Sequence, residues 1–366
     1  MEVYTMQYVE GMIYQDTGFI HGYLEYHAGV VTEVGSGTYP KHGERLAKGV
    51  VIPLLTNCHT HLGDAIAHGR TFDGDIESLV APPNGLKFKI IHESTSDDLI
   101  KAMNSAIIQM LNTGTGSFID FRECGLTGVN QLQRATNVLP INTFIMGRPE
   151  GLNYSKDELI SLLKEVTGIG ISSITDWNYD ELEKLSKTTK QYGKSFALHA
   201  SERIHENLDK ILNLNPDFLV HMTCGTDSDF ETLAELGIPI VVCPRSRIFF
   251  NNIPNIRKML DKGVTLVLGS DNAMFNSPNL FEELKIGFIL ANKFGTVKPE
   301  TMLKMITINT KKVLNPKYHI SLAPGSPSNF MVLDIPLENP EHTLVFGVKP
   351  ENIKIVNILN SVWNIR

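Results

Sequence analysis

The chain has 366 residues, of which 42% are hydrophobic and 20% are charged, as in a soluble globular protein with a large core. Its formal net charge is -7 and no block of Lys or Arg offsets it, so we expect no nucleic-acid partner. No apolar run approaches the roughly 18 residues that cross a bilayer, so we expect no membrane partner either.

The two ends of the chain show the same pattern of short strands broken by glycine-containing turns. Neither end has enough strands to bury a core alone, because isolated hairpins are marginally stable. We therefore predict that residues 1–49 and 321–366 form one small β-sandwich domain built from both termini. The C-terminal runs are NFMVLDI (329–335), TLVFGV (343–348) and NIKIVNILNSVWNI (352–365).

Residues 50–320 alternate short apolar runs with amphipathic helical patterns such as those at 96–111, 157–166, 180–193 and 229–237. Gly193, Gly237 and Gly263 stand where helix C-caps are expected. Eight strand candidates between helices predict the α/β class and a (β/α)8 TIM barrel, with an open doubly wound sheet as the alternative. The runs are VVIPLL (50–55), GSFIDF (116–121), INTFIM (141–146), GIGISSI (168–174), KSFALH (194–199), DFLVH (217–221), IPIVVC (238–243) and VTLVLG (264–269).

Side chains that can bind a metal follow four of these runs. In TNCHTHLGD, two histidines stand two residues apart, so on a strand their imidazoles point the same way. A pair of exposed loop histidines is the alternative for that stretch alone. In a barrel, however, the carboxyl ends of the strands meet at one face, where active sites lie. The candidates are His59, His61, His199, Glu202, His221 and Asp271.

Imidazole nitrogens with one carboxylate oxygen suit Zn²⁺, and Fe²⁺ is the alternative. We predict one divalent ion per chain, with a water in the open position that becomes a nucleophile near neutral pH. Glu202 and His221 would move protons around it. The predicted ligands are His59, His61, His199 and Asp271, and Asp271 is also a predicted catalytic residue.

Taken together, HTH (59–61), HASE (199–202), His221 and GSD (269–271) resemble the amidohydrolase superfamily, and within it the adenosine, S-adenosylhomocysteine and cytosine deaminase branch. CPRSRIFFN (243–251), SPNLFEELKIG (277–287) and GSPSNFMVLD (325–334) are similar to further segments of that branch. In that branch the HASE-type His is a ligand and the Glu protonates a ring nitrogen. The resemblance therefore implies a metal-dependent aminohydrolase that releases ammonia from an amino-substituted N-heteroaromatic, such as a nucleobase or nucleoside.

Two departures from the pattern bear on the substrate and the fold. The stretch ISSITDWNYD (171–180) lacks the substrate-facing histidine of S-adenosylhomocysteine deaminases, and Asn329 stands where Asp is usual. Relatives with the same ligands also hydrolyse cyclic amides, formimino groups or aryl chlorides, so this reaction class stays open. A non-catalytic barrel scaffold is the alternative from another class.

Residues near strand ends are also the candidates for lining the pocket. Arg148 and Trp177 are predicted to bind substrate, although Arg148 has an ion pair within the protein as its alternative. Asp64 and Glu123 are further candidates, and the Pro-rich segment 80–91 is expected to be a loop that covers the site. An ion pair with a neighbouring cation, such as Arg203, is the alternative to a catalytic role for Glu202.

The four cysteines are scattered, form no CxxC pair and follow no recognisable secretory leader. A reducing cytoplasm is therefore the predicted compartment. The expected partner is a small-molecule substrate, and a homo-oligomer stays open beside a monomer.

Overall fold

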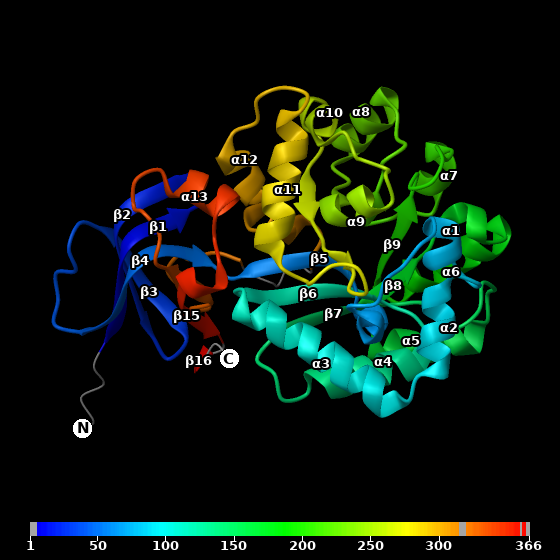
Figure 1. The fold of residues 1–366 in the computed structure, drawn as a ribbon, viewed down its shortest axis with the longest axis horizontal. Coiled ribbons are helices and arrows are strands. Elements are labelled where there is room, and N and C mark those ends of the chain that lie inside the picture. Colours follow the sequence, from blue (N-terminus) through cyan, green and yellow to red (C-terminus); the bar gives the residue numbers. More distant parts are fainter. Residues whose placement is uncertain (1–5, 315–319, 359–360, 364–366) are drawn as a thin grey trace.

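The computed structural model describes residues 6–314, 320–358 and 361–363, and within these residues it forms two β-sheets (Figure 1). A nine-stranded sheet is parallel throughout and is covered by helices. A seven-stranded, mainly antiparallel sheet lies beside it, at the left of the view, and carries both the blue N-terminal strands and the red C-terminal strands. The fold is therefore mixed α/β.

The nine-stranded sheet curls back toward its own beginning. Its order is β12-β11-β10-β9-β8-β7-β6-β5-β13, and β13 pairs with β5 through Asp271 and Thr60. Only two residues separate β12 from β13, although these strands stand at opposite ends of the order. The strands are β5 (Leu55–His61), β6 (Thr115–Arg122), β7 (Asn142–Gly147), β8 (Gly168–Ile171), β9 (Ser195–Ala200), β10 (Phe218–His221), β11 (Ile240–Val242), β12 (Leu266–Leu268) and β13 (Asp271–Asn272).

The Asn57 side chain in β5 binds Ser270, which precedes β13, and this holds the two ends of the sheet together. The Asn57 side chain donates to Ser270 Oγ at 2.7 Å and accepts from the Ser270 amide at 3.0 Å. A Cβ atom on Gly269 would lie 2.6 Å from the Cβ of His59, so this close approach requires glycine. The junction consequently holds His59 and Asp271 near each other.

Apolar side chains fill both faces of the nine-stranded sheet. The larger cluster lies between the strands and the helices. A separate cluster takes alternate residues of several strands, among them Phe121, Ala197, Val220 and Val267, on the opposite face. This second cluster forms a floor beneath the carboxyl ends of the strands.

The connections between the strands are mostly helical. None of the helices in the described ranges is both long and apolar enough to cross a bilayer. The predicted helices at 96–111, 157–166, 180–193 and 229–237 are confirmed as α3, α5, α6 and α8. Their N-caps include Thr95, Asn178 and Thr226, each of which accepts from a backbone amide of the first turn. The helices are α1 (Ile76–Leu79), α2 (Leu86–Glu93), α3 (Ser96–Asn112), α4 (Gly125–Thr136), α5 (Lys156–Glu165), α6 (Tyr179–Gln191), α7 (Leu208–Asn213), α8 (Asp227–Leu236), α9 (Pro244–Phe249), α10 (Ile256–Asp261), α11 (Leu280–Asn292), α12 (Pro299–Lys304) and α13 (Pro340–Phe346), with 3-10 turns η1 (Leu62–Ala67), η2 (Ile174–Asp176), η3 (Ile308–Lys312) and η4 (Pro350–Asn352).

The seven-stranded sheet joins segments from both ends of the chain. Its order is β16-β15-β14-β4-β1-β2-β3, in which β4 pairs parallel with β1 and antiparallel with β14. It is one continuous sheet rather than two stacked ones, and its β3 edge hydrogen-bonds to the segment 325–328 that precedes β14. The strands are β1 (Gln7–Gln15), β2 (Gly18–His27), β3 (Val30–Ser36), β4 (Glu44–Pro53), β14 (Phe330–Leu333), β15 (Ile353–Ile358) and β16 (Ser361–Trp363).

Three local predictions differ from the structure. The run VVIPLL is divided, because β4 ends at Pro53 and β5 begins at Leu55, so the HTH motif lies within β5. TLVFGV was expected as a strand but enters α13, where Pro340 occupies the first helical position and Leu344 and Val345 are buried. The segment 80–91 is only partly a loop, since α2 begins at Leu86. Residues 359–360 and 364–365 of the predicted final strand lie outside the described residues.

Candidate metal centre

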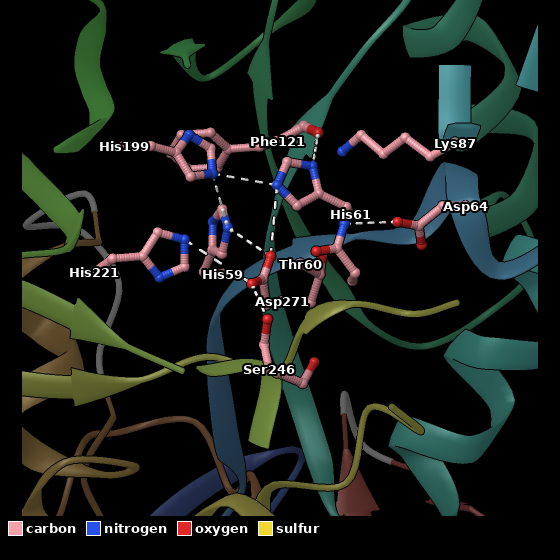
Figure 2. A network of polar contacts seen from close by, with 12 residues as sticks. His59, Thr60, His61, Asp64, Lys87, Phe121, His199, His221, Ser246 and Asp271 are labelled. Carbon is pink, nitrogen blue, oxygen red and sulfur yellow. Dashed lines mark hydrogen bonds and ion pairs between the residues drawn. The ribbon is translucent and has the colours of Figure 1, made fainter. Parts of the chain in front are cut away.

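The four predicted ligands converge on one point, where β5 and β9 end and β13 begins (Figure 2). His199 Nε2 lies 3.2 Å from His59 Nε2 and 3.3 Å from His61 Nε2. Asp271 Oδ1 lies 3.4 Å from His59 Nε2 and 3.7 Å from His61 Nε2. All four side chains are buried.

An irregularity in β5 and regular alternation in β9 direct the predicted ligand histidines toward the inner side of the sheet. The β5–β6 register shifts between Asn57 and Thr60, a bulge that precedes His61 and lets both Cys58 and His59 lie on the inner side. His199 lies two residues after the inward-facing Ala197 and follows simple alternation.

At Asp271, and at His221 beside the predicted ligands, the backbone is left-handed. Phe218 and Val220 face the inner cluster, so alternation would turn His221 away from it. Instead β10 ends at His221 with φ of 75°, and Asp271 has φ of 60°. A sequence pattern cannot anticipate such conformations in residues other than glycine.

Hydrogen bonds at the far ring nitrogens fix how two of the imidazoles face the centre. His199 Nδ1 lies 2.8 Å from the Ile171 carbonyl oxygen, and His61 Nδ1 lies 3.1 Å from that of Phe121. Because a carbonyl only accepts, each Nδ1 carries the proton and each Nε2 presents a lone pair to the centre. Two lone pairs 3.3 Å apart repel unless a cation stands between them.

The donor set fits a single divalent metal ion. Around a tetrahedral ion with bonds of about 2.0–2.2 Å, ligand atoms stand roughly 3.3–3.6 Å apart, and the spacings here fall close to that range. Three imidazole nitrogens with one carboxylate oxygen suit Zn²⁺ or Fe²⁺. Cys243 also lies near Asp271 and His221, but burial raises the pKa of its thiol well above the usual value, which disfavours a thiolate ligand.

The electrostatics of the centre keep His61 and His199 neutral. Burial lowers the pKa of His61 to about 3, and burial together with the neighbouring histidines lowers the pKa of His199 well below its ordinary value. Burial alone would raise the pKa of Asp271, but contacts with His59, His221 and Arg247 outweigh it and hold that pKa well below the usual range. Neutral imidazoles and an ionised carboxylate are the protonation states that bind metal.

The predicted proton-transfer residues lie beside the ligands. His221 Nε2 lies 3.4 Å from Glu202 Oε1 and 3.9 Å from Asp271 Oδ2. Burial and the charge of Arg247 lower the pKa of His221 well below its ordinary value, so it is neutral at rest. Glu202 forms an ion pair with a neighbouring cation, as its alternative role expects, but the cation is Arg247; Arg203 pairs with Glu77 and Asp176 instead.

Arg247 was not singled out from the sequence, although it lies within CPRSRIFFN. Its guanidinium is almost fully buried and donates to Glu202 Oε1, to Ser246 Oγ at 2.9 Å and to Asp271 Oδ2 at 3.2 Å. Ser246 Oγ also donates to Asp271 Oδ2 at 2.6 Å. These donors occupy Oδ2 and leave Oδ1 directed at the histidines.

A cavity opens onto the centre. Glu202, His221 and Asp271 line it together with Arg148. Its wall also includes polar residues that the sequence pattern did not indicate, because they come from connections far apart along the chain. These are Lys87, Ser172, Ser173, Asp176, Arg203 and Asn272.

Of the candidate substrate residues Arg148, Trp177, Asp64 and Glu123, only Arg148 lines this cavity. Arg148 is buried, yet its Nε has no hydrogen-bond partner among the described residues, and the expected alternative of an internal ion pair is not observed there. Trp177 does not line the cavity; it packs in the main core and donates from Nε1 to Ser172 Oγ at 3.3 Å. Asp64 also lies behind the wall, where it accepts from the Asn272 side chain and the Met274 amide. Glu123 lies behind His61.

Comparison with known proteins gives a match over most of the chain. The model of the amidohydrolase family matches residues 50–360. The chain belongs to the amidohydrolase family. An uncharacterised protein from Methanocaldococcus jannaschii is 34% identical over 301 residues, covering 76% of this chain and 77% of that protein. A 5'-deoxyadenosine deaminase from Methanosarcina mazei is 26% identical over 367 residues, covering 87% of this chain and 81% of that protein.

The solved structures extend the likeness to the whole fold. An adenosine deaminase from Xanthomonas campestris with bound zinc superposes with a TM-score of 0.81 at 17% identity, covering 97% of this chain and 92% of that one. At this identity the likeness shows the fold alone. As an amidohydrolase with deaminase-named relatives, the chain is a metal-dependent hydrolase that acts on carbon–nitrogen bonds.

Proposed function

We propose that this amidohydrolase is a mononuclear aminohydrolase that deaminates an amino-substituted N-heteroaromatic compound and releases ammonia. The observation that supports this most is the convergence of three imidazole nitrogens and Asp271 Oδ1, with the Glu202–His221 pair beside them on the cavity wall. Relatives named as deaminases support the same reaction class. Among the residues of the cavity wall, Arg148 bears on which compound is bound.

His59, His61, His199 and Asp271 would hold the ion, Zn²⁺ for preference and Fe²⁺ as the alternative. A divalent ion bound there would lower the pKa of a water ligand to near neutrality. Every other group that the reaction needs comes from the chain.

Glu202 would donate a proton to the ring nitrogen next to the amine-bearing carbon, which makes that carbon electrophilic. His221 and Asp271 would orient the attacking water and take its proton. His221, neutral at rest, would pass that proton to the departing amine. Water adds to carbon, the carbon–nitrogen bond breaks, and the remaining proton of the water would return to Glu202 as the ring carbonyl compound forms and ammonia leaves.

Arg148 would anchor the substrate. The Nε–H donor of this buried guanidinium has no partner among the described residues, which is costly unless a ligand accepts from the group. Arginine matches planar acceptors, so a carboxylate or ring carbonyl of the substrate is the group expected here. The indole of Trp177 would act only indirectly, by holding Ser172 on the wall.

We further propose that residues 50–320 close into a (β/α)8 barrel and that 1–49 and 321–366 form a composite β domain. The β5–β13 pairing and the separate inner cluster support closure. Since β4 continues to Pro53, the first barrel strand would start at Leu55.

Metal-loaded protein should be screened against aminated purines, pyrimidines, pterins and their nucleosides, with ammonia release as the measure. Release from at least one compound, lost when the metal is chelated and restored by adding it back, would support the proposal. Hydrolysis of cyclic amides or aryl chlorides without ammonia from any aminated ring would contradict it.

A further inference from the structure

Glu123 is a buried carboxylate with three charged or polar neighbours and no place in the proposed chemistry. Its Oε1 lies 2.7 Å from His61 Nδ1 and 2.8 Å from Lys87 Nζ, while Oε2 accepts from Arg122 Nη2 at 2.5 Å. Glu123 is 1% exposed, and Lys87 and Arg122 are each 2% exposed. Burying three ionised groups costs desolvation free energy, which is repaid only when their contacts with one another are close and well oriented.

The three predicted ligand histidines are supported unequally. His199 Nδ1 contacts only a backbone carbonyl, and His59 Nδ1 has no hydrogen-bond partner in the described part of the chain. His61 alone has a carboxylate at Nδ1, in addition to the Phe121 carbonyl. A carboxylate on the far nitrogen of a metal-binding imidazole fixes the ring and makes it a stronger donor.

Lys87 connects this carboxylate to the wall of the cavity. It comes from α2, just after Ala81 and Pro82, which line the cavity with it. Figure 2 shows the Lys87 side chain extending toward the ring of His61. Because Lys87 and His61 contact the same oxygen of Glu123, the lysine competes with the imidazole for that oxygen.

We propose that Glu123 is a positioning residue that sets the metal affinity of the centre through His61, and that Lys87 weakens this support by sharing Oε1. The inference rests on the metal site of the proposed function, but not on its substrate. It predicts opposite behaviour for two variants of one ion pair. Glu123→Gln loosens the metal, whereas Lys87→Met binds it at least as tightly as the wild type.

The test measures Zn²⁺ affinity by competition with a chelator and, separately, the visible spectrum of the Co²⁺-substituted protein. Glu123→Gln should raise the Zn²⁺ Kd by roughly 10- to 100-fold and shift the Co²⁺ bands. The matched control is Glu283→Gln, because Glu283 is also fully buried and paired with an arginine, Arg245, but contacts no predicted ligand. It should keep the wild-type Kd and spectrum.

The double variant Glu123→Gln/Lys87→Met separates positioning from a mere imbalance of buried charge. It should bind metal as weakly as Glu123→Gln; recovery of the wild-type Kd would overturn the inference, since the loss would then come from the unpaired lysine. Wild-type affinity in Glu123→Gln would also overturn it. If that variant does not fold, Glu123→Asp, which withdraws the carboxylate by one methylene, replaces it with the same expectation. A wild-type protein that holds no divalent ion would instead refute the proposed function, and the inference with it.

Discussion

Replacing Glu202 by Gln removes the proposed proton donor while changing little else. The side chain is 12% exposed on the cavity wall, and its Oε1 accepts from Arg247. The Gln amide oxygen can still accept from Arg247, and the guanidinium keeps Asp271 as its second partner at 3.2 Å. Fold and metal content should therefore stay near those of the wild type.

The loss of activity should be large because no other acid takes the place of Glu202. His221 Nε2, 3.4 Å from Glu202 Oε1, is neutral and is already assigned to the proton from water. General acid catalysis contributes roughly 10²- to 10⁴-fold, or about 3 to 5 kcal/mol of the barrier. A decrease of kcat within that range is the expected result.

The assay is kcat and KM from ammonia release, with metal content measured on the same preparation. Glu25→Gln provides the control, since Glu25 is also a buried, hydrogen-bonded glutamate but lies in the seven-stranded sheet. Nearly full turnover in Glu202→Gln with normal metal content would refute the assignment of the acid. Loss of metal together with turnover would show that Glu202 supports the centre rather than the proton transfer.

Three further predictions concern the metal, the substrate and pH. The protein should hold one divalent ion per chain, and His59→Ala should lower both metal content and activity; two tightly held ions in elemental analysis would contradict this. Arg148→Met should raise KM by roughly 10- to 100-fold with little change in kcat, because the guanidinium would bind substrate and transition state alike; an unchanged KM would count against it. Burial raises the pKa of Asp64 to about 7, so the folded protein keeps a proton there that the unfolded chain releases above about pH 4, and wild-type stability from this group falls as pH rises from about 4 to 7. An Asn amide can accept from only one of the two N–H groups that Asp64 accepts from, so Asp64→Asn carries a cost that does not depend on pH. Its stability relative to the wild type should nevertheless rise between pH 5 and pH 7, by on the order of 2 kcal/mol in urea unfolding, and a difference that does not change with pH would refute the shift.

The order of the elements was readable because periodicity is a local property of the chain. Helices such as α3 and α6 have N-cap residues and apolar positions at helical spacing, and both end close to the predicted boundaries. The strand predicted at 343–348 failed because a short apolar run fits a buried helix as well as a strand, and Pro340 decided for the helix. The break between β4 and β5 was missed because both strands are apolar and one Leu separates them.

The residue types that could form the centre followed from the amino-acid pattern, because imidazoles and a carboxylate placed at strand ends limit the chemistry whatever their exact positions. How these side chains meet depends on tertiary contacts. The bulge in β5, the left-handed backbone at His221 and Asp271, and the pairing of β13 with β5 arise from contacts between segments far apart along the chain. For the same reason Arg247, Lys87 and Glu123 could not be assigned beforehand, since a buried charge acquires its role only from the partners that folding brings to it.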